Sequence, residues 1–240
     1  MNFKVLIYVC TITLFSCAKP EYDVVIVGGG ASGITAAIQS SRLGSKTLLI
    51  EKTDWLGGML TSAGVSAMDG NYNMPGGFIK EFRDSLVSYY GSLENLKTGW
   101  VSNIMFEPSV GNKILNSIAQ TQDNLEIVFN SSVKKIDNKK GNWEVTLDSN
   151  SDLPKVTSKI LIDATELGDL IPILNIPYSI GMDSNSQFAE KIAPLKSNNI
   201  IQDLTYVMIL KDYGKDVTIN EPLNYNRKEF LCSYESKECF

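Results

Sequence analysis

The sequence predicts an α/β fold built on a parallel sheet with crossover helices, and three observations carry this prediction. The β-branched run 22–27 has the composition of a fully buried strand. The pattern Gly28-x-Gly30-x-x-Gly33 follows it directly and opens a helix. A second apolar run, 46–50, ends in Glu51 at the distance expected of a dinucleotide-binding βαβ unit. We therefore expect a Rossmann-like domain.

Each residue type in the glycine pattern has a physical role. Gly28 permits the tight turn from strand to helix, and Gly30 lets a pyrophosphate approach the backbone. Gly33 allows the helix to lie close to the strand. The backbone N–H groups around Ala31, Ser32 and Gly33 are at a helix N-terminus, which carries about half a positive charge and suits phosphates.

Glu51 is the expected partner of a ribose. Its carboxylate can accept hydrogen bonds from ribose hydroxyls, and it disfavours a 2′-phosphate at the same place. A glycine-rich turn in an ordinary α/β protein is the alternative interpretation. That alternative explains neither Glu51 nor its spacing from the glycines.

The rest of the chain predicts further elements in order. A helix over 31–42 ends at Gly44, an amphipathic helix covers 78–89, and another helix follows Pro108. Short strands are expected at 125–129, 132–136 and 143–147, and a buried strand at 156–162.

This order predicts a parallel-sheet domain that is interrupted by an α+β insertion. We expect the nucleotide domain to comprise residues 22–52 and about 156–175, with the insertion at 53–155. Residues 176–240 are expected to begin a substrate or cap region that is incomplete.

The first residues indicate an export signal. Lys4 precedes the apolar run 5–15, which is short for a membrane anchor, and the run ends before Cys17. This arrangement resembles a bacterial lipoprotein signal over 1–16, with lipid attached at Cys17 and the protein anchored in the cell envelope, facing the periplasm or the surface. An ordinary signal peptide that contains a cysteine is the alternative.

The composition excludes several kinds of chemistry. The chain has no histidine, which removes Ser–His and Cys–His catalysis and imidazole zinc sites. Of its four cysteines, only Cys232 and Cys239 remain beyond the signal and Cys17, too few for a four-ligand iron–sulfur cluster. We predict no metal site. The net charge of −5 gives no reason to expect nucleic acid as a partner.

Two later motifs carry a resemblance to a known family. Glu51-Lys52-x-x-x-Leu56-Gly57-Gly58-Met59 resembles the acid and double-glycine extension of flavoproteins with the glutathione-reductase type of FAD fold. The stretch 160–170, Ile-Leu-Ile-Asp-Ala-Thr-Glu-Leu-Gly-Asp-Leu, resembles the strand and turn that pass under the dinucleotide in that fold. The sequence of this stretch most resembles that of bacterial FAD-dependent oxidoreductases related to the flavin subunit of heterodisulfide reductase, including xanthan-lyase-like members.

The resemblance implies FAD as the cofactor and hydride transfer as the reaction, with an unidentified small organic or sugar-derived substrate. It adds Val133, by its backbone, as a contact of the adenine. A single GxGxxG leaves the chain without a second unit for NAD(P)H. The residues expected to bind FAD are Gly28, Gly30, Ala31, Ser32, Gly33, Glu51, Lys52, Gly57, Gly58, Met59, Val133, Ala164, Thr165, Gly168 and Asp169; the sequence indicates no particular catalytic residue.

Two other functions stay open at this point. Members of this family are longer, so the chain could be a truncated, non-catalytic FAD-binding fragment. An NAD-dependent dehydrogenase is the second alternative, which Glu51 alone would permit and which the pair Gly57-Gly58 disfavours.

Overall fold

The computed structural model describes residues 20–99, 102–149, 153–205, 207–208, 211, 213–226 and 228. The predicted signal and Cys17 lie outside these residues. The chain divides into two compact units, Met1–Val207 and Met208–Phe240. All helices and strands named below belong to the first unit.

A six-stranded mixed sheet forms the centre of the first unit, with the strand order β3-β2-β1-β6-β5-β4. Four strands run parallel: β3 (Leu125–Val128), β2 (Thr47–Ile50), β1 (Tyr22–Val27) and β6 (Lys155–Asp163). The strands β4 (Ser131–Lys139) and β5 (Asn142–Ser149) form an antiparallel hairpin, and β5 also pairs antiparallel with β6. The predicted α/β class is therefore confirmed.

The β1 strand divides the core between the two faces of the sheet. Val24 and Ile26 pack with the helices, whereas Val25 and Val27 belong to a second buried cluster with residues of the hairpin. This division follows from the period of two in a strand, which sends successive side chains to opposite faces. Because both faces are covered, the strand is apolar at almost every position.

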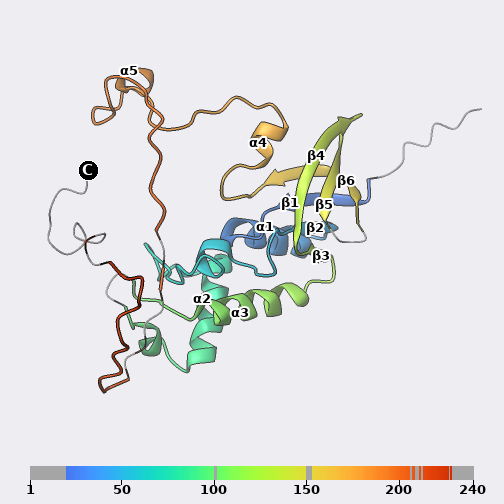
Figure 1. Ribbon diagram of the computed structural model, residues 1–240. Helices are drawn as coiled ribbons and strands as arrows, with labels where there is room; N and C mark the ends of the chain where they lie inside the picture. The colour runs from blue at the N-terminus through green and yellow to red at the C-terminus, as the bar shows by residue number, and fades with distance from the viewer. Residues whose placement is uncertain are drawn as a thin grey trace, which may run out of the picture. The chain divides into compact units, whose positions relative to one another are not determined.

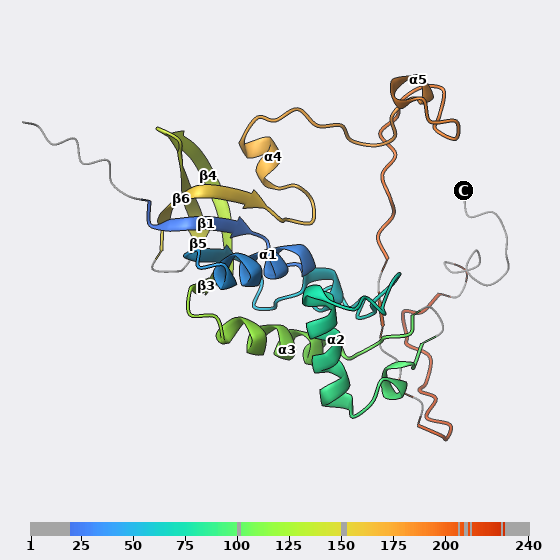
Figure 2. The ribbon, with the colours of Figure 1, turned by 180° about the vertical axis from the view of Figure 1, so that it is seen from behind.

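The helix α1 (Ala31–Arg42) lies against one face of the sheet, and two further helices, α2 (Gly77–Tyr90) and α3 (Pro108–Gln120), pack beyond it, with α3 against α1 and α2 against α3 (Figures 1 and 2). They match the three helices that the sequence predicts. In α2, Phe82 and Leu86 are buried, whereas Ile79 and Tyr89 of the same predicted apolar face are exposed. Two short helices follow later, α4 (Leu170–Ile173) and α5 (Asn185–Phe188). No helix among the described residues has the length and apolar character needed to cross a bilayer.

The strands of the predicted insertion belong to the sheet. β3 continues its parallel half beside β2, and β4 and β5 extend it beyond β6. The stretch between β2 and β3, which holds α2 and α3, is thus the part of 53–155 that lies outside the sheet. The physical reason is that parallel pairing needs a crossover, and this stretch supplies the crossover from β2 to β3.

The last parallel strand, β6, is less buried than the sequence suggests. Val156 and Ser158 are buried, but the side chain of Ile160 is 54% exposed. Ile160 pairs with Val24, on the face that α1 covers over β1, β2 and β3. The helix does not extend over β6, so this end of the strand is open.

Candidate cofactor site

A cleft lies at the carboxyl edge of the parallel strands. The strands β1, β2 and β6 end together at this edge, because Val27 pairs with both Ile50 and Asp163. Ligands of open α/β sheets bind at this edge. The lining residues come from four places in the chain: Val27, Gly28, Gly30, Ile50, Glu51, Lys52, Thr53, Gly58, Ser62, Ser131, Ser132, Val133, Ala164, Thr165, Glu166, Asp169, Leu170 and Ile173.

The first wall is the turn from β1 to α1. Gly28 has φ +96°, and a Cβ on it would lie 2.6 Å from the carbonyl oxygen of Ala164. A Cβ on Gly33 would collide with the carbonyl oxygen of Gly28. Gly30 differs, because its φ is −62° and a Cβ there would meet only the Glu166 carboxylate, at 3.7 Å. Gly28 and Gly33 are therefore needed for packing, whereas Gly30 keeps the cleft open.

The start of α1 faces this wall without a side-chain cap. No side chain makes a capping hydrogen bond there, and the first turn contains no acidic residue. The first N–H groups of a helix have no intrahelical partner, and their end of the helix dipole is positive. Such an end can receive the negative charge of a ligand.

The second wall is the double-glycine turn after β2, and it touches the first. The Gly57 N–H donates to the Gly29 carbonyl oxygen at 2.8 Å, and Gly57 forms an isolated bridge with Gly30. Gly58 has φ +53°, and a Cβ on it would be 2.9 Å from the Gly30 Cα. Two bare backbones thus meet, with no side chain of their own between them and the cleft.

The Glu51 carboxylate fastens the two turns. It is buried, and its Oε2 accepts a hydrogen bond from the Gly29 N–H at 2.6 Å. Its Oε1 accepts from the Thr53 N–H at 2.8 Å and from the Thr53 hydroxyl at 2.7 Å. A carboxylate has about four lone-pair positions, so three donors leave capacity for a ligand hydroxyl. Glu51 therefore has a structural role in addition to the predicted one.

The turn after β6 forms the third wall. Asp163 Oδ1 accepts from the Thr165 N–H at 3.0 Å and from its hydroxyl at 2.7 Å. The Asp169 N–H donates to the Thr165 hydroxyl oxygen at 2.7 Å, and the Leu170 N–H donates to Asp163 Oδ2 at 3.2 Å. Asp169 is the N-cap residue of α4 but makes no capping bond with its side chain. Asp163 provides that bond instead.

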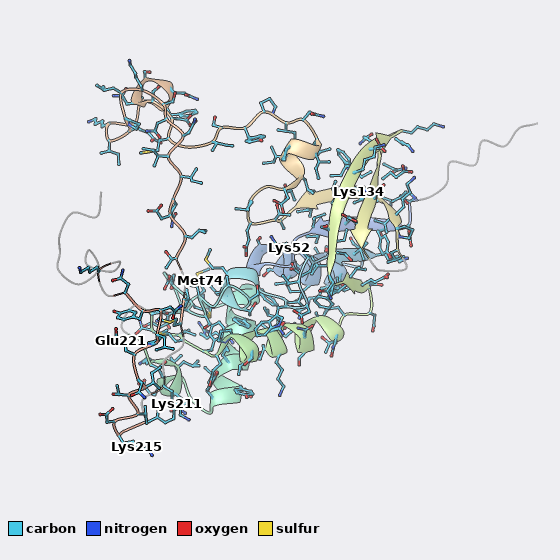
Figure 3. All side chains as sticks on the ribbon, viewed as in Figure 1. Lys52, Met74, Lys134, Lys211, Lys215 and Glu221 are labelled. Atoms are coloured by element: carbon cyan, nitrogen blue, oxygen red, sulfur yellow. The ribbon has the colours of Figure 1, made fainter. Side chains whose placement is uncertain are left out.

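The far end of the cleft lies beside the β4 strand. Val133 pairs with Leu147 and Lys135 with Thr146, so the ladder skips Lys134 at a bulge. Bulges redirect the local backbone and are common near sites. Figure 3 labels Lys134 on this strand and Lys52, an exposed residue, next to the end of β2. No group of three Cys, Asp or Glu side chains suited to a metal ion occurs in the part of the chain that the structure describes.

The structure brings most of the predicted residues to the cleft and places the others beside it. Gly33 and Gly57 do not line the cleft but allow the close packing of the two turns. Ala31 lines a neighbouring apolar cleft. Ser32 and Met59 are exposed, and Gly168 has φ +69° in the loop before α4. The predicted residues that line the cleft are Gly28, Gly30, Glu51, Lys52, Gly58, Val133, Ala164, Thr165 and Asp169.

Sequence reasoning missed several polar residues of the cleft. Thr53 and Asp163 organise the turns, Ser131 and Ser132 line the β4 end, and Glu166 lies over the glycines. Asp163 has a readable signal, since an Asp or Ser/Thr two residues before a backbone N–H often closes a local turn. Glu166 has none, because its position depends on how two distant loops meet.

The arrangement fits a dinucleotide. Gly30 leaves room that a Cβ would fill, a helix N-terminus faces that room, and the Glu51 carboxylate retains acceptor capacity at the end of β2. These are the features of a protein that binds a dinucleotide at a βαβ turn. The chain belongs to the FAD dependent oxidoreductase family, whose family model matches residues 23–237. FAD is the cofactor of this family.

Individual relatives match only part of the chain. Leghemoglobin reductase of Vigna unguiculata is 41% identical over 58 residues, which make up 24% of this chain and 11% of the relative. NADH:fumarate oxidoreductase of Klebsiella pneumoniae (strain 342) is 36% identical over 88 residues, 36% of this chain and 9% of the relative. The matched segments therefore span about a tenth of these relatives.

A solved structure matches a longer stretch of the chain. A crystal structure of OTEMO in complex with FAD and NADP has 24% identity and a TM-score of 0.41. The match covers 62% of this chain and 26% of that chain.

Proposed function

We propose that this protein is an FAD-dependent oxidoreductase that transfers a hydride between a small organic or sugar-derived substrate and bound FAD. The observation that carries the proposal is the contact between the two glycine turns. The Gly30–Gly57 bridge and the Gly57 N–H···O=C Gly29 bond hold two bare backbones together at the N-terminus of α1. A dinucleotide-binding site needs only the glycine turn after β1. The double-glycine turn after β2 provides an additional backbone surface for a diphosphate and for the part of the cofactor beyond it.

Each residue of the site would contact a different part of FAD. Gly30 and Gly58 admit the diphosphate, and the first amides of α1 face its charge. Glu51 would accept hydrogen bonds from the ribose hydroxyls, and the backbone at Val133 of β4 would contact the adenine. FAD supplies the redox chemistry when bound, because its flavin exchanges hydrides, and the protein's task is to position the donor.

The turn 160–170 and the double glycine support a finer assignment. They resemble the branch related to the flavin subunit of heterodisulfide reductase and to xanthan-lyase-like proteins. The sequence contains a single GxGxxG. We propose that electrons reach the flavin from the substrate itself or from a partner protein.

A lipid anchor at Cys17 completes the proposal. The apolar run 5–15 and the cysteine at its end favour a bacterial envelope protein that faces the periplasm or the surface. Mass spectrometry of the mature protein tests this directly. A lipidated N-terminal Cys17 supports the anchor, and an intact residue 1 or a cleavage at another position contradicts it.

The activity is tested by following the flavin absorption of the FAD-loaded protein under anaerobic conditions. Candidate donors, such as sugars and small hydroxy or amino acids, are added one at a time. The expected result is bleaching of the flavin band by at least one donor class, at a rate that depends on its concentration. A loaded protein that no donor bleaches, while dithionite does, would contradict the proposed oxidoreductase activity.

A further inference from the structure

Glu166 lies in an unexpected place for an acidic residue. It follows β6 in the chain, yet its carboxylate reaches across the cleft to the two glycine turns. A Cβ on Gly58 would collide with Glu166 Oε1, and a Cβ on Gly30 would lie 3.7 Å from the same oxygen. The carboxylate therefore rests against both bare backbones, on the surface that a diphosphate would use.

The local electrostatics explain this position. The first turn of α1 has no acidic residue and no side-chain cap, so its positive end has no negative partner of its own. Glu166 brings a negative charge from another strand to that end. In the described part of the chain, no hydrogen bond or ion pair holds its carboxylate, and the residue is exposed. The side chain is thus free to turn away.

The other acid beside these turns is held differently. Both oxygens of Glu51 accept hydrogen bonds from Gly29 or Thr53, so that carboxylate is fixed. Glu51 can remain in place when a ribose binds, because it offers acceptors to hydroxyl donors. A diphosphate offers only acceptors and negative charge, so it and the Glu166 carboxylate cannot share one surface.

We propose that the Glu166 carboxylate occupies the diphosphate surface in the ligand-free protein, so that every dinucleotide must displace it. We call this carboxylate a gate. The proposal rests on the proposed FAD site and adds a residue that sets its affinity. Binding then includes the loss of the carboxylate's attraction to the helix end, together with repulsion from the displaced side chain. Both contributions weaken binding of ligands that carry a diphosphate and leave other ligands unaffected.

The test compares Glu166→Gln with Asp123→Asn in the full chain. Both variants remove one negative charge, but Asp123 precedes β3, whose first residue pairs with the start of β2 at the opposite edge of the sheet. FAD and ADP affinities are measured by fluorescence titration and calorimetry. We expect Glu166→Gln to bind both ligands about tenfold more tightly than the parent, and Asp123→Asn to match the parent.

Two further readouts separate a gate from a change in folding. Adenosine, which has no phosphate, should bind the parent and Glu166→Gln equally. The gain for FAD should shrink between about 0.05 M and 0.5 M salt, because salt screens the repulsion. Equal FAD affinity in all three proteins, or an equal gain for adenosine, would overturn the gate but leave the FAD site standing. If neither the parent nor Glu166→Gln binds FAD or ADP, the proposed function fails as well.

Discussion

Three glycines in one short turn meet three different physical requirements. Gly28 has a positive φ, which favours glycine. Gly33 has no space for a side chain, because the Gly28 carbonyl oxygen fills it. Neither requirement applies to Gly30. At Gly30 an alanine would be unstrained within the fold. The fold therefore does not require a glycine at this position, and the proposed diphosphate contact supplies a reason for it.

Gly33→Ala should destabilise the protein by about 1–3 kcal/mol, because the added methyl forces α1 away from β1. The matched control is Gly76→Ala, at the N-cap of α2, where φ is −158° and no atom lies within 4 Å of the added Cβ. We expect the control to change stability by less than about 0.5 kcal/mol. Urea unfolding measures both, and equal midpoints would contradict the packing role of Gly33.

Glu51→Gln should lower the free energy of unfolding of the ligand-free protein and also weaken the contact with a ribose. An amide has one oxygen, so either the Gly29 N–H or the Thr53 donors would face an NH2 group, which costs about 1–3 kcal/mol. Glu126→Gln is the control, because the Tyr22 hydroxyl, 2.6 Å from its Oε2, keeps an acceptor. Chemical unfolding without ligand compares them. A Glu51→Gln protein as stable as the control would mean that Glu51 does not fasten the turns.

At this scale the sequence predicts the residues whose spacing has a local cause. The glycine intervals and Glu51 follow from the geometry of one βαβ unit, so they can be located without a structure. Glu166 and the Gly29–Gly57 contact depend on loops that are distant in the chain. No periodicity or spacing encodes where those loops meet.

At the scale of elements, Glu144 ties the hairpin to the parallel half of the sheet. It lies on β5 and forms ion pairs with Lys139 of β4 at 2.7 Å and with Lys155 of β6 at 2.9 Å. These hydrogen-bonded ammonium groups lower the pKa of Glu144 from 4.5 to about 2. A carboxylate whose pKa falls on folding stabilises the fold above its unfolded pKa, and this contribution disappears as the pH falls toward the folded value.

The stability difference between the parent and Glu144→Gln should therefore depend on pH. We expect the parent to be more stable at pH 7, and the difference to shrink below about pH 4.5 and to be lost as the pH falls through about 2. High salt should reduce it at neutral pH, since the pair is near the surface. Urea midpoints at several pH values provide the measurement. A difference that is the same at pH 3 and pH 7 would contradict the assigned role.

The elements themselves could be predicted better than their pairing. The glycine pattern predicts α1, apolar periodicity predicts α2 and α3, and the strands at 125–129 and 143–147 correspond to β3 and β5. Their membership in the central sheet was not predicted, because a short strand does not reveal its partner. β3 pairs with β2 across a long crossover, and only tertiary packing decides such a contact.

At the scale of the whole molecule, the site is a meeting of distant segments. The turn after β1, the turn after β2, the start of β4 and the turn after β6 converge because the four parallel strands β1, β2, β3 and β6 end at one edge. The sheet order thus determines which parts of the sequence can form a cofactor site.

FAD titration of the parent protein and of Gly30→Ala is the most direct test of the cofactor site. Gly30 has φ −62°, and a Cβ there would touch only the Glu166 carboxylate, so the variant should fold with unchanged stability. We expect the parent to bind one equivalent of FAD and Gly30→Ala to bind at least about tenfold more weakly, since its methyl enters the diphosphate surface. A parent protein that takes up no flavin, or a Gly30→Ala variant that binds FAD equally well, would contradict the cofactor site.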